Sequence, residues 1–455
     1  MNLLMYKDGP LQCRLPVVHP KTVPTGSQST LSTEGIRVLS TRSIFMPDPI
    51  FPEGKFGQAA AFDFRQRSNL QELDRQLYSH WGLGQNLVMA WCPHPTGIQV
   101  LVVPHHAVAS YGASGNTGSP ADNSLSPAHE FIMHLLSGSR QFNARQMNNA
   151  THLLGVEAIQ IRLRQALTGS ADEAAVIDQI VKRYSVSYIH NRAVALFDIV
   201  GFSLLSPFEQ MTQLSSLSCS LNAAHSRLMG RRMMVDFARS TTGDGFYIWN
   251  RDAGLEANTN LYHFMHLVLA DNAIARQKAA SRTVPLLRTS FHVGNCYEFH
   301  HAEGLNPTMY CDIVGDVTIE LARMVEHAMP GQILVGDFAL ETISQEPVTG
   351  AVFDAISFIE QAQNSLSQLN GLELSGDAVE SIKCYLTGQA CADGTFTIRK
   401  LAIHCKHGLT RNAFNAKVNI HRRGATPILL GIEDKLLCDD ERYAVTRGHV
   451  VRDGL

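Results

Sequence analysis

The chain has 455 residues, of which 45% are hydrophobic and 17% are charged, and its formal net charge at pH 7 is -3. Such a small net charge gives no reason to expect a nucleic acid or an acidic membrane as a partner. No apolar run approaches the roughly 20 residues of a membrane-spanning helix, and residues 1–20 lack the basic-then-apolar pattern of a signal peptide. The nine cysteines are scattered without a C-x-x-C pair, which is typical of free thiols in a reducing compartment. We therefore expect a cytoplasmic protein without a membrane span.

Residues 1–150 are predicted to form a small N-terminal α+β domain with a sensory or regulatory role. Residues 1–45 are rich in Pro, Ser and Thr and are predicted to be irregular. The Gly- and Ser-rich residues 111–127 are predicted to form a flexible loop. Hydrophobic periodicity predicts the regular elements: helices over 68–80, 128–136 and 144–153, and strands over 86–91 and 97–103.

Residues 151–185 are predicted to form a linker that includes a helix over 172–184. Apolar side chains share one face of this helix at helical spacing: Val176, Ile177, Ile180, Val181 and Tyr184. Two interpretations are equally open. Either this face packs on its own domain, or it pairs with the same helix of a second chain.

Two aspartates at predicted strand ends carry the strongest chemical signal. Asp198 follows the apolar run Arg192–Phe197, and Asp244 lies in the turn Gly243–Gly245 before a second apolar run. Asp-Gly is also a common hairpin turn, and an aspartate after a strand is often only a helix cap. Carboxylates held together at neighbouring strand ends nevertheless suit Mg²⁺ and the oxygens of a polyphosphate. The backbone N–H groups of residues 199–203 are expected to face phosphate as the chain turns into a helix.

Three downstream segments complete the pattern: Leu287–Gly294 (LRTSFHVG), Tyr310–Asp316 (YCDIVGD) followed by a predicted helix over 317–327, and Pro330–Val335 (PGQILV). In this order, after the two aspartates, these segments resemble the catalytic core of class III nucleotidyl cyclases. Those enzymes convert a nucleoside triphosphate to a 3′,5′-cyclic nucleotide and pyrophosphate. The resemblance therefore implies a signalling enzyme of the adenylate cyclase type.

The resemblance implies an α+β catalytic domain with a ferredoxin-like core over residues 186–405, in which helices cover one face of an antiparallel sheet. Periodicity adds helices over 207–229, 261–279 and 355–369, and strands over 382–386 and 395–404. Residues 406–455 are left as a C-terminal extension without an assigned role. A single catalytic domain implies a homodimer with two composite sites. At each site, one chain would supply the aspartates and the other would supply Arg323 and Asp312.

The resemblance also implies roles for individual residues. Asp198, Asp244 and the backbone carbonyl of Ile199 are expected to bind two Mg²⁺ or Mn²⁺ ions per site. Arg323 is expected to stabilise charge on the α-phosphate, because a guanidinium is always charged and forks onto phosphate oxygens. Contacts to the nucleoside triphosphate are expected from five residues: Gly201, Phe202, Ser203, Ser240 and Asp312.

Two positions depart from the family pattern. Ser240 stands where adenine-specific members have a lysine, and a serine does not choose between bases. Asp312 then favours ATP, while GTP and the pyrimidine triphosphates stay open. Ile319 stands where the family has an asparagine that orients the ribose. Three interpretations are open: the enzyme has weak activity, Thr318 substitutes for the asparagine, or the chain is a non-catalytic nucleotide-binding module. The lysine expected to bind the triphosphate is one of two candidates: Lys383 and Lys400.

Overall fold

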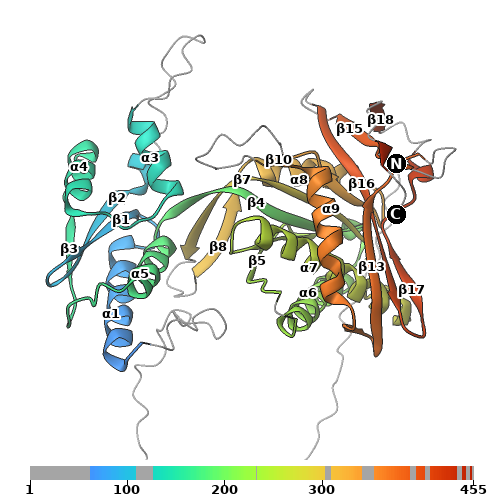
Figure 1. The fold of residues 1–455 in the computed structure, drawn as a ribbon, viewed down its shortest axis with the longest axis horizontal. Helices are drawn as coiled ribbons and strands as arrows, with labels where there is room; N and C mark the ends of the chain where they lie inside the picture. The colour runs from blue at the N-terminus through green and yellow to red at the C-terminus, as the bar shows by residue number, and fades with distance from the viewer. Residues whose placement is uncertain are drawn as a thin grey trace, which may run out of the picture. The chain divides into compact units, whose positions relative to one another are not determined.

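The structure is a computed structural model that describes residues 62–108, 127–231, 233–302, 309–340, 353–389, 396–404, 410–437, 443–446 and 451–452 (Figure 1). Contacts divide the chain into two units, and every described residue belongs to the unit of residues 46–455. The irregular segment predicted over 1–45 lies outside the described residues, and so does the predicted loop except for Pro127. In the described part of the chain, no helix is long and apolar enough to cross a membrane.

Residues 62–183 combine helices with a three-stranded antiparallel sheet in the order β1-β2-β3. Asp63 and Gln66 form a capping box that begins the first helix, and the left-handed Gly82 ends it. The helices and strands predicted here from periodicity are confirmed. Their bounds are α1 (Phe64–Trp81), β1 (Asn86–His94), β2 (Gly97–Pro104), α3 (Pro127–Ser137), α4 (Ala144–Leu154), β3 (Ile159–Arg162) and α5 (Ala171–Arg183).

The apolar face of α5 packs within its own chain. Its side chains share one buried core with α1 and β1: Val176, Ile177, Ile180, Val181 and, just beyond the helix, Tyr184. The Tyr184 hydroxyl donates to Asp74 Oδ1 of α1 at 2.7 Å. Because this face is covered, the structure supports packing on its own domain over pairing with a second chain.

A larger sheet carries the two aspartates. Its central strands lie in the order β7-β4-β6-β5, and each neighbouring pair is antiparallel. One helix connects β4 to β5 and another connects β6 to β7, so the strands follow the 4-1-3-2 order of a ferredoxin-like βαββαβ unit. The bounds are β4 (Val186–Ile199), α6 (Pro207–Met229), β5 (Phe237–Thr241), β6 (Gly245–Asn250), α7 (Leu255–Lys278) and β7 (Leu287–Ala302). The predicted α+β class and ferredoxin-like core are confirmed.

Helices cover both faces of this sheet, so the prediction of helices on one face was wrong. α6, α7 and α9 (Ala355–Ser365) pack on the face that includes Phe197. α8 (Asp316–His327) packs on the opposite face, against Val194 and Leu196. The physical cause lies in β4, whose C-terminal half is buried without alternation and therefore needs cover on both sides. Burying one large apolar side chain such as Phe197 contributes about 1.5–3 kcal/mol to folding.

The sheet continues beyond β7. β9 (Ile333–Gly336) pairs in parallel with β7 and antiparallel with β16 (Thr410–Arg422), and β13 (Asp377–Leu386) follows. β16 lies in the expected C-terminal extension, so the sheet extends past residue 405. The remaining elements are η2 (Phe202–Leu204), β8 (Met309–Val314), β10 (Ala339–Leu340), β11 (Phe353–Asp354), η3 (Leu366–Leu369), β12 (Glu373–Leu374), β14 (Phe396–Thr397), β15 (Lys400–His404), β17 (Ala425–Leu430), η4 (Asp434–Leu436), β18 (Tyr443–Thr446) and β19 (Val451–Arg452).

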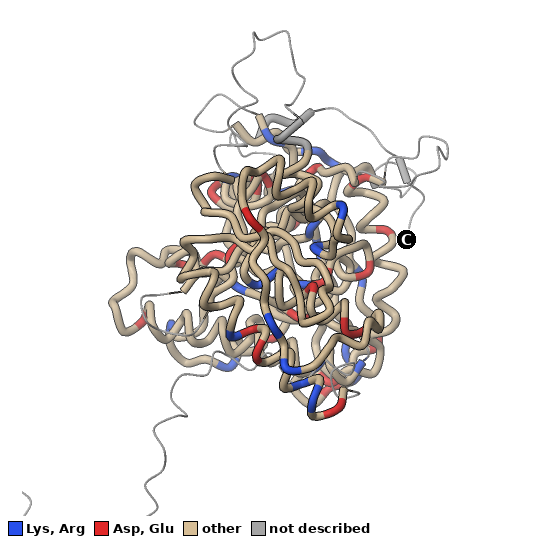
Figure 2. The backbone as a smooth tube through the Cα atoms, turned by 90° about the vertical axis from the view of Figure 1, so that its left-hand side faces the viewer, with Lys and Arg blue, Asp and Glu red and all other residues tan. Residues whose placement is uncertain are grey.

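Charged residues of both signs are interspersed along the described chain in the view of Figure 2. With a net charge of -3, the chain has little long-range attraction for a polyanion. Any nucleotide site on this chain would therefore depend on local contacts.

Candidate functional site

The two aspartates lie side by side at the ends of neighbouring strands, as predicted. Asp198 is the penultimate residue of β4 and pairs in register with Gly245 of β6. The next N–H group along β4, that of Ile199, donates to the backbone carbonyl of Asp244 at 3.0 Å. Asp244 lies in the turn that joins β5 to β6. The sheet register therefore holds the two carboxylate-bearing residues together.

Two glycines explain how the turn approaches β4 so closely. A Cβ atom on Gly245 would lie 1.9 Å from the backbone oxygen of Phe197, so only glycine fits there. Gly243 has φ +94°, a conformation that L side chains rarely adopt. The Thr242 hydroxyl donates to Asp244 Oδ1 at 3.1 Å and orients that carboxylate. The predicted Gly243–Gly245 turn is confirmed.

Asp198 is buried beside a cation. It is 6% exposed, and Arg288 Nε donates to its Oδ2 at 2.5 Å. The two residues face each other directly across the β4–β7 pair. Burial raises the pKa of Asp198, the bonded Arg288 guanidinium lowers it, and the nearby charge of Asp244 raises it, with a net upward shift. Sequence analysis missed Arg288 as a site residue, although its strand segment was part of the recognised pattern.

Arg288 also reaches the end of α8. Its Nη1 donates to the backbone carbonyl of Glu326 at 3.5 Å, in the last turn of that helix. Arg323 lies one turn earlier, where its Nη1 is 3.4 Å from Glu326 Oε2 and its carbonyl is 3.0 Å from His327 Nδ1. The Arg323 side chain is 32% exposed, so part of its guanidinium faces solvent.

The segment expected to bind phosphate differs from the prediction in its first two residues. The N–H groups of Ile199 and Val200 donate to the carbonyls of Asp244 and Leu286, at 3.0 and 2.9 Å. They are therefore not available to phosphate, because the hydrogen bonds between strands continue to the end of β4. Gly201 then turns the chain with φ +69°, and η2 begins at Phe202. Contacts to phosphate from Gly201, Phe202 and Ser203 stay predictions.

The residues expected to select the base lie on two strands that contact each other. Ser240 is on β5 opposite Tyr247 of β6, Asp312 is on β8 opposite Phe299 of β7, and β5 contacts β8. Asp312 Oδ2 is 3.4 Å from His301 Nδ1. Their roles in base recognition stay predictions.

The side chains around Ile319 show what stands in place of the asparagine. Ile319 is 50% exposed, so its apolar side chain faces solvent on α8. The neighbouring Thr318 hydroxyl donates to the Gly315 carbonyl at 2.8 Å, and is thus already engaged within the helix start. Of the two candidate lysines, Lys400 Nζ contacts Asp337 Oδ2 at 2.7 Å, whereas Lys383 is exposed on β13.

The residues present offer oxygen ligands, which suit a hard divalent ion such as Mg²⁺ or Mn²⁺. Among the described residues, no group of three or more His, Cys, Asp or Glu side chains is placed to hold a metal. Two carboxylates and nearby backbone carbonyls are a suitable protein share for Mg²⁺, which keeps water ligands and takes phosphate oxygens as well. In this structure, the Asp198 carboxylate is paired with the positive charge of Arg288.

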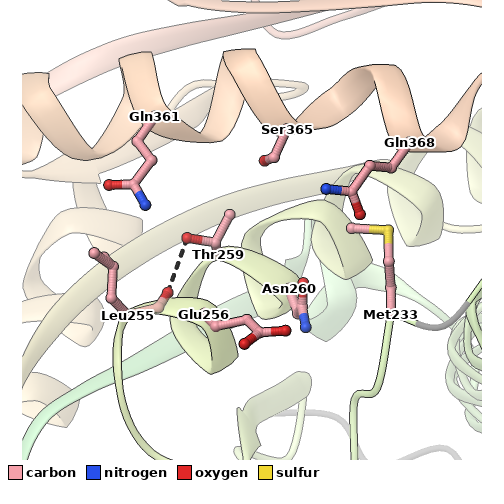
Figure 3. A pocket seen from close by; sticks show the side chains of 8 residues that line it. All are labelled: Met233, Leu255, Glu256, Thr259, Asn260, Gln361, Ser365 and Gln368. Carbon is pink, nitrogen blue, oxygen red and sulfur yellow. Dashed lines mark hydrogen bonds between the residues drawn. The ribbon is translucent and has the colours of Figure 1, made fainter.

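A cavity of about 410 Å³ lies elsewhere, between the start of α7 and the α9–η3 segment (Figure 3). Its lining includes Glu256 and no lysine or arginine. Two hydroxyls on its walls are satisfied internally, since Thr259 Oγ1 donates to the Leu255 carbonyl and Ser365 Oγ lies 2.7 Å from His263 Nε2. The α7 residues that line the cavity come after the C-terminal end of β6, whereas Asp244 lies just before its N-terminal end. This cavity is therefore not suited to a nucleoside triphosphate.

No protein-family model matches the sequence, and no curated protein matches it. Solved structures match parts of the chain. The guanylate cyclase domain of RhGC from Catenaria anguillulae, in complex with GTP, is 12% identical, and the match covers 52% of this chain and 99% of that one with a TM-score of 0.31. The adenylyl cyclase CyaB from P. aeruginosa is 13% identical, with 53% and 100% covered and a TM-score of 0.28.

A third match is the monomeric guanylyl cyclase domain of the RhoGC fusion protein from Blastocladiella emersonii. It is 17% identical, and the match covers 33% of this chain and 83% of that one with a TM-score of 0.26. Two of these matches are guanylate or guanylyl cyclase domains, and one is an adenylyl cyclase. The chain itself has an α+β sheet of ferredoxin-like order in which two aspartates meet at the strand ends.

Proposed function

We propose that this chain is a nucleotidyl cyclase, which converts a nucleoside triphosphate to a 3′,5′-cyclic nucleotide and pyrophosphate in a signalling role. The observation that carries the proposal is the pair Asp198 and Asp244, held together by the register of β4 and β6 and by the close approach of Gly245. The resemblance of the motifs to class III cyclases supplies the reaction, and the geometry of the pair supports it.

Asp198 and Asp244, with the carbonyl of Ile199, would hold two Mg²⁺ or Mn²⁺ ions. Such ions supply activation of the ribose 3′-hydroxyl and charge neutralisation on the triphosphate. Asp198 must be ionised to bind a cation, and burial opposes this by raising its pKa. Arg288 lowers that pKa by its hydrogen bond and charge, which favours the ionised form of the carboxylate.

Arg323 would stabilise charge on the α-phosphate. Its guanidinium is partly exposed, and Glu326 holds it at a single contact of 3.4 Å. A surface ion pair of this kind is worth about 0–1 kcal/mol, so it yields readily to a phosphate. Arg323 is therefore free to exchange partners when a nucleotide arrives.

The proposed assembly is a two-fold homodimer with two composite sites. In each site, one chain would supply Asp198 and Asp244, and the partner chain would supply Arg323, Ser240 and Asp312. Asp312 can accept a hydrogen bond from an exocyclic amino group, which favours ATP. GTP and the pyrimidine triphosphates are alternative substrates, because Ser240 replaces the lysine of adenine-specific cyclases.

One observation favours a second candidate function, a nucleotide-binding regulatory module with little or no turnover. Ile319 presents an exposed apolar side chain where the family has an asparagine, and the Thr318 hydroxyl is already bonded to Gly315. Losing one transition-state donor typically lowers turnover by about 10²–10³-fold. Metal-dependent nucleotide binding without a cyclic product would support this module.

The testing experiment incubates purified protein and Mn²⁺ with ATP, GTP, CTP or UTP and identifies products by mass spectrometry. A cyclic monophosphate from one nucleotide, lost in Asp198→Asn and in Asp244→Asn, supports the proposal. Asp236→Asn is the matched control, because Asp236 precedes β5, away from the Asp244 turn, and pairs with Arg251 at 2.8 Å. Equal product from Asp198→Asn and the control variant would contradict the assignment of Asp198.

A further inference from the structure

Arg288 lies where a metal ion would meet Asp198. Its Nε is 2.5 Å from Asp198 Oδ2, while Mg²⁺ binds carboxylate oxygens at about 2.0–2.1 Å. A divalent ion on the same oxygen would place two positive centres within about 5 Å, where like charges repel strongly in a partly buried site. The guanidinium and the ion therefore compete for one carboxylate.

The arginine is the partner that can move. The Asp198 side chain is short and 8% exposed, and its residue is held in the sheet. The Arg288 side chain is long and flexible, and it is 29% exposed. The carbonyl of Glu326 offers a second partner already within 3.5 Å of Nη1. The C-terminal end of a helix carries partial negative charge, so a guanidinium released from Asp198 is stabilised there.

We propose that Arg288 is an exchangeable internal counter-ion for the divalent-ion site: it holds Asp198 while no ion is bound and gives up that carboxylate when an ion binds. Arg288 is then a positioning residue that sets the affinity of the site for its ion. It keeps the buried carboxylate paired in the free protein, and an unpaired buried charge is strongly unfavourable. The proposal rests on the proposed function, because it assumes that Asp198 is an ion ligand.

The consequence is that Arg288 raises the concentration of ion that the site requires. In Arg288→Gln, an incoming ion displaces no competing charge, so Mn²⁺ binds more tightly than in the wild type. We expect the Kd for Mn²⁺ to fall by about tenfold, which corresponds to about 1.4 kcal/mol. Arg288→Lys retains the positive charge, so its Kd stays within about threefold of the wild-type value.

The test measures Mn²⁺ alone, without nucleotide, on the full chain at pH 8. Electron paramagnetic resonance of free Mn²⁺ gives the Kd, and thermal unfolding gives the shift in Tm on adding Mn²⁺. Arg288→Gln should melt below the wild type without Mn²⁺ and show the larger rise in Tm with it. Arg227→Gln is the matched control, since Arg227 pairs with Asp271 at 2.7 Å on α6 and α7 with comparable exposure.

The outcomes separate this inference from the proposed function. If Asp198→Asn abolishes Mn²⁺ binding but Arg288→Gln binds Mn²⁺ no more tightly than the wild type, Arg288 is not a counter-ion, and the ion site stands. If the wild type shows no Asp198-dependent Mn²⁺ binding, both ideas are overturned. Should Arg288→Gln fail to fold without Mn²⁺, Arg288→Lys decides instead. A Kd for Mn²⁺ within about threefold of the wild-type value supports the counter-ion role, whereas a Kd more than tenfold weaker would indicate a structural role.

Discussion

Substituting Gly245 with alanine tests whether the turn that carries Asp244 depends on its close approach to β4. The new Cβ would lie 1.9 Å from the Phe197 oxygen, well inside any ordinary contact. The turn must then move by about 1 Å or more to relieve this overlap, which would break the Ile199–Asp244 backbone hydrogen bond of 3.0 Å. Each such bond contributes about 0.5–1.5 kcal/mol, and strained packing adds about 1–3 kcal/mol. We expect Gly245→Ala to lower the free energy of unfolding by about 2–4 kcal/mol.

Gly243→Ala in the same turn is the matched control. Nothing lies within 4 Å of a Cβ at Gly243, so only its positive φ is unfavourable, at about 1–2 kcal/mol. Urea denaturation of both variants gives the two losses of stability, and Mn²⁺ binding reports whether Asp198 and Asp244 still act together. The reasoning is refuted if Gly245→Ala is no less stable than Gly243→Ala or binds Mn²⁺ as the wild type does.

Three further predictions follow from the same structure. Arg323→Ala should lower turnover by about 10²–10³-fold with a smaller change in KM, as measured by steady-state kinetics. Its free energy of unfolding, measured by urea denaturation, should change by less than about 1 kcal/mol, because Arg323 contacts Glu326 at the surface. Ile319→Asn should raise turnover at least about tenfold by restoring a ribose contact, without loss of stability at a half-exposed position; an unchanged rate would contradict the role given to this position. Burial lowers the pKa of His263 to about 3 from the ordinary 6.5, so the unfolded chain binds a proton below pH 6.5 that the folded chain does not. His263 therefore contributes a loss of stability of up to about 1.4 kcal/mol per pH unit as the pH falls from 6.5 towards 3. His263→Gln, which can still bond Ser365, should make that part of the urea-denaturation profile less steep. Burial also lowers the pKa values of His266, His292 and His300, which account for the slope that stays.

The sequence predicted the aspartate pair because its signals are local. An apolar run that ends in Asp198, and an Asp-Gly turn before another apolar run, define two strand ends without knowledge of the rest of the fold. The pairing of those strands follows from the β4–β6 register. The ferredoxin-like order was predicted from the resemblance of the motifs, and the observed strand order confirms it.

The contact between Arg288 and Asp198 was missed because it depends on a non-local register. Ninety residues separate the two side chains in sequence, and only the antiparallel pairing of β4 with β7 brings the end of one strand to the start of the other. A signal was available: an arginine that begins an apolar strand beside a predicted acidic strand end. The packing of α8 on the second face of the sheet was also missed. Its signal was the unbroken apolar run of β4, which indicates burial on both sides.

β16 escaped prediction because buried polar residues interrupt its apolar pattern. Asn415 and Lys417 are 1% and 5% exposed in this strand. Their polar groups are satisfied within the fold, Asn415 by Gln332 and Thr387 and Lys417 by Glu433. Periodicity cannot anticipate such partners, because they come from distant parts of the chain.

The most direct test of the proposed function is product identification after incubation with Mn²⁺ and each of the four nucleoside triphosphates, for the wild type and for Asp198→Asn, Asp244→Asn and Asp236→Asn. The account predicts one 3′,5′-cyclic monophosphate with pyrophosphate, present in the wild type and Asp236→Asn and absent in the other two. No cyclic product from any nucleotide, or a product that persists without Asp198 and Asp244, would contradict it.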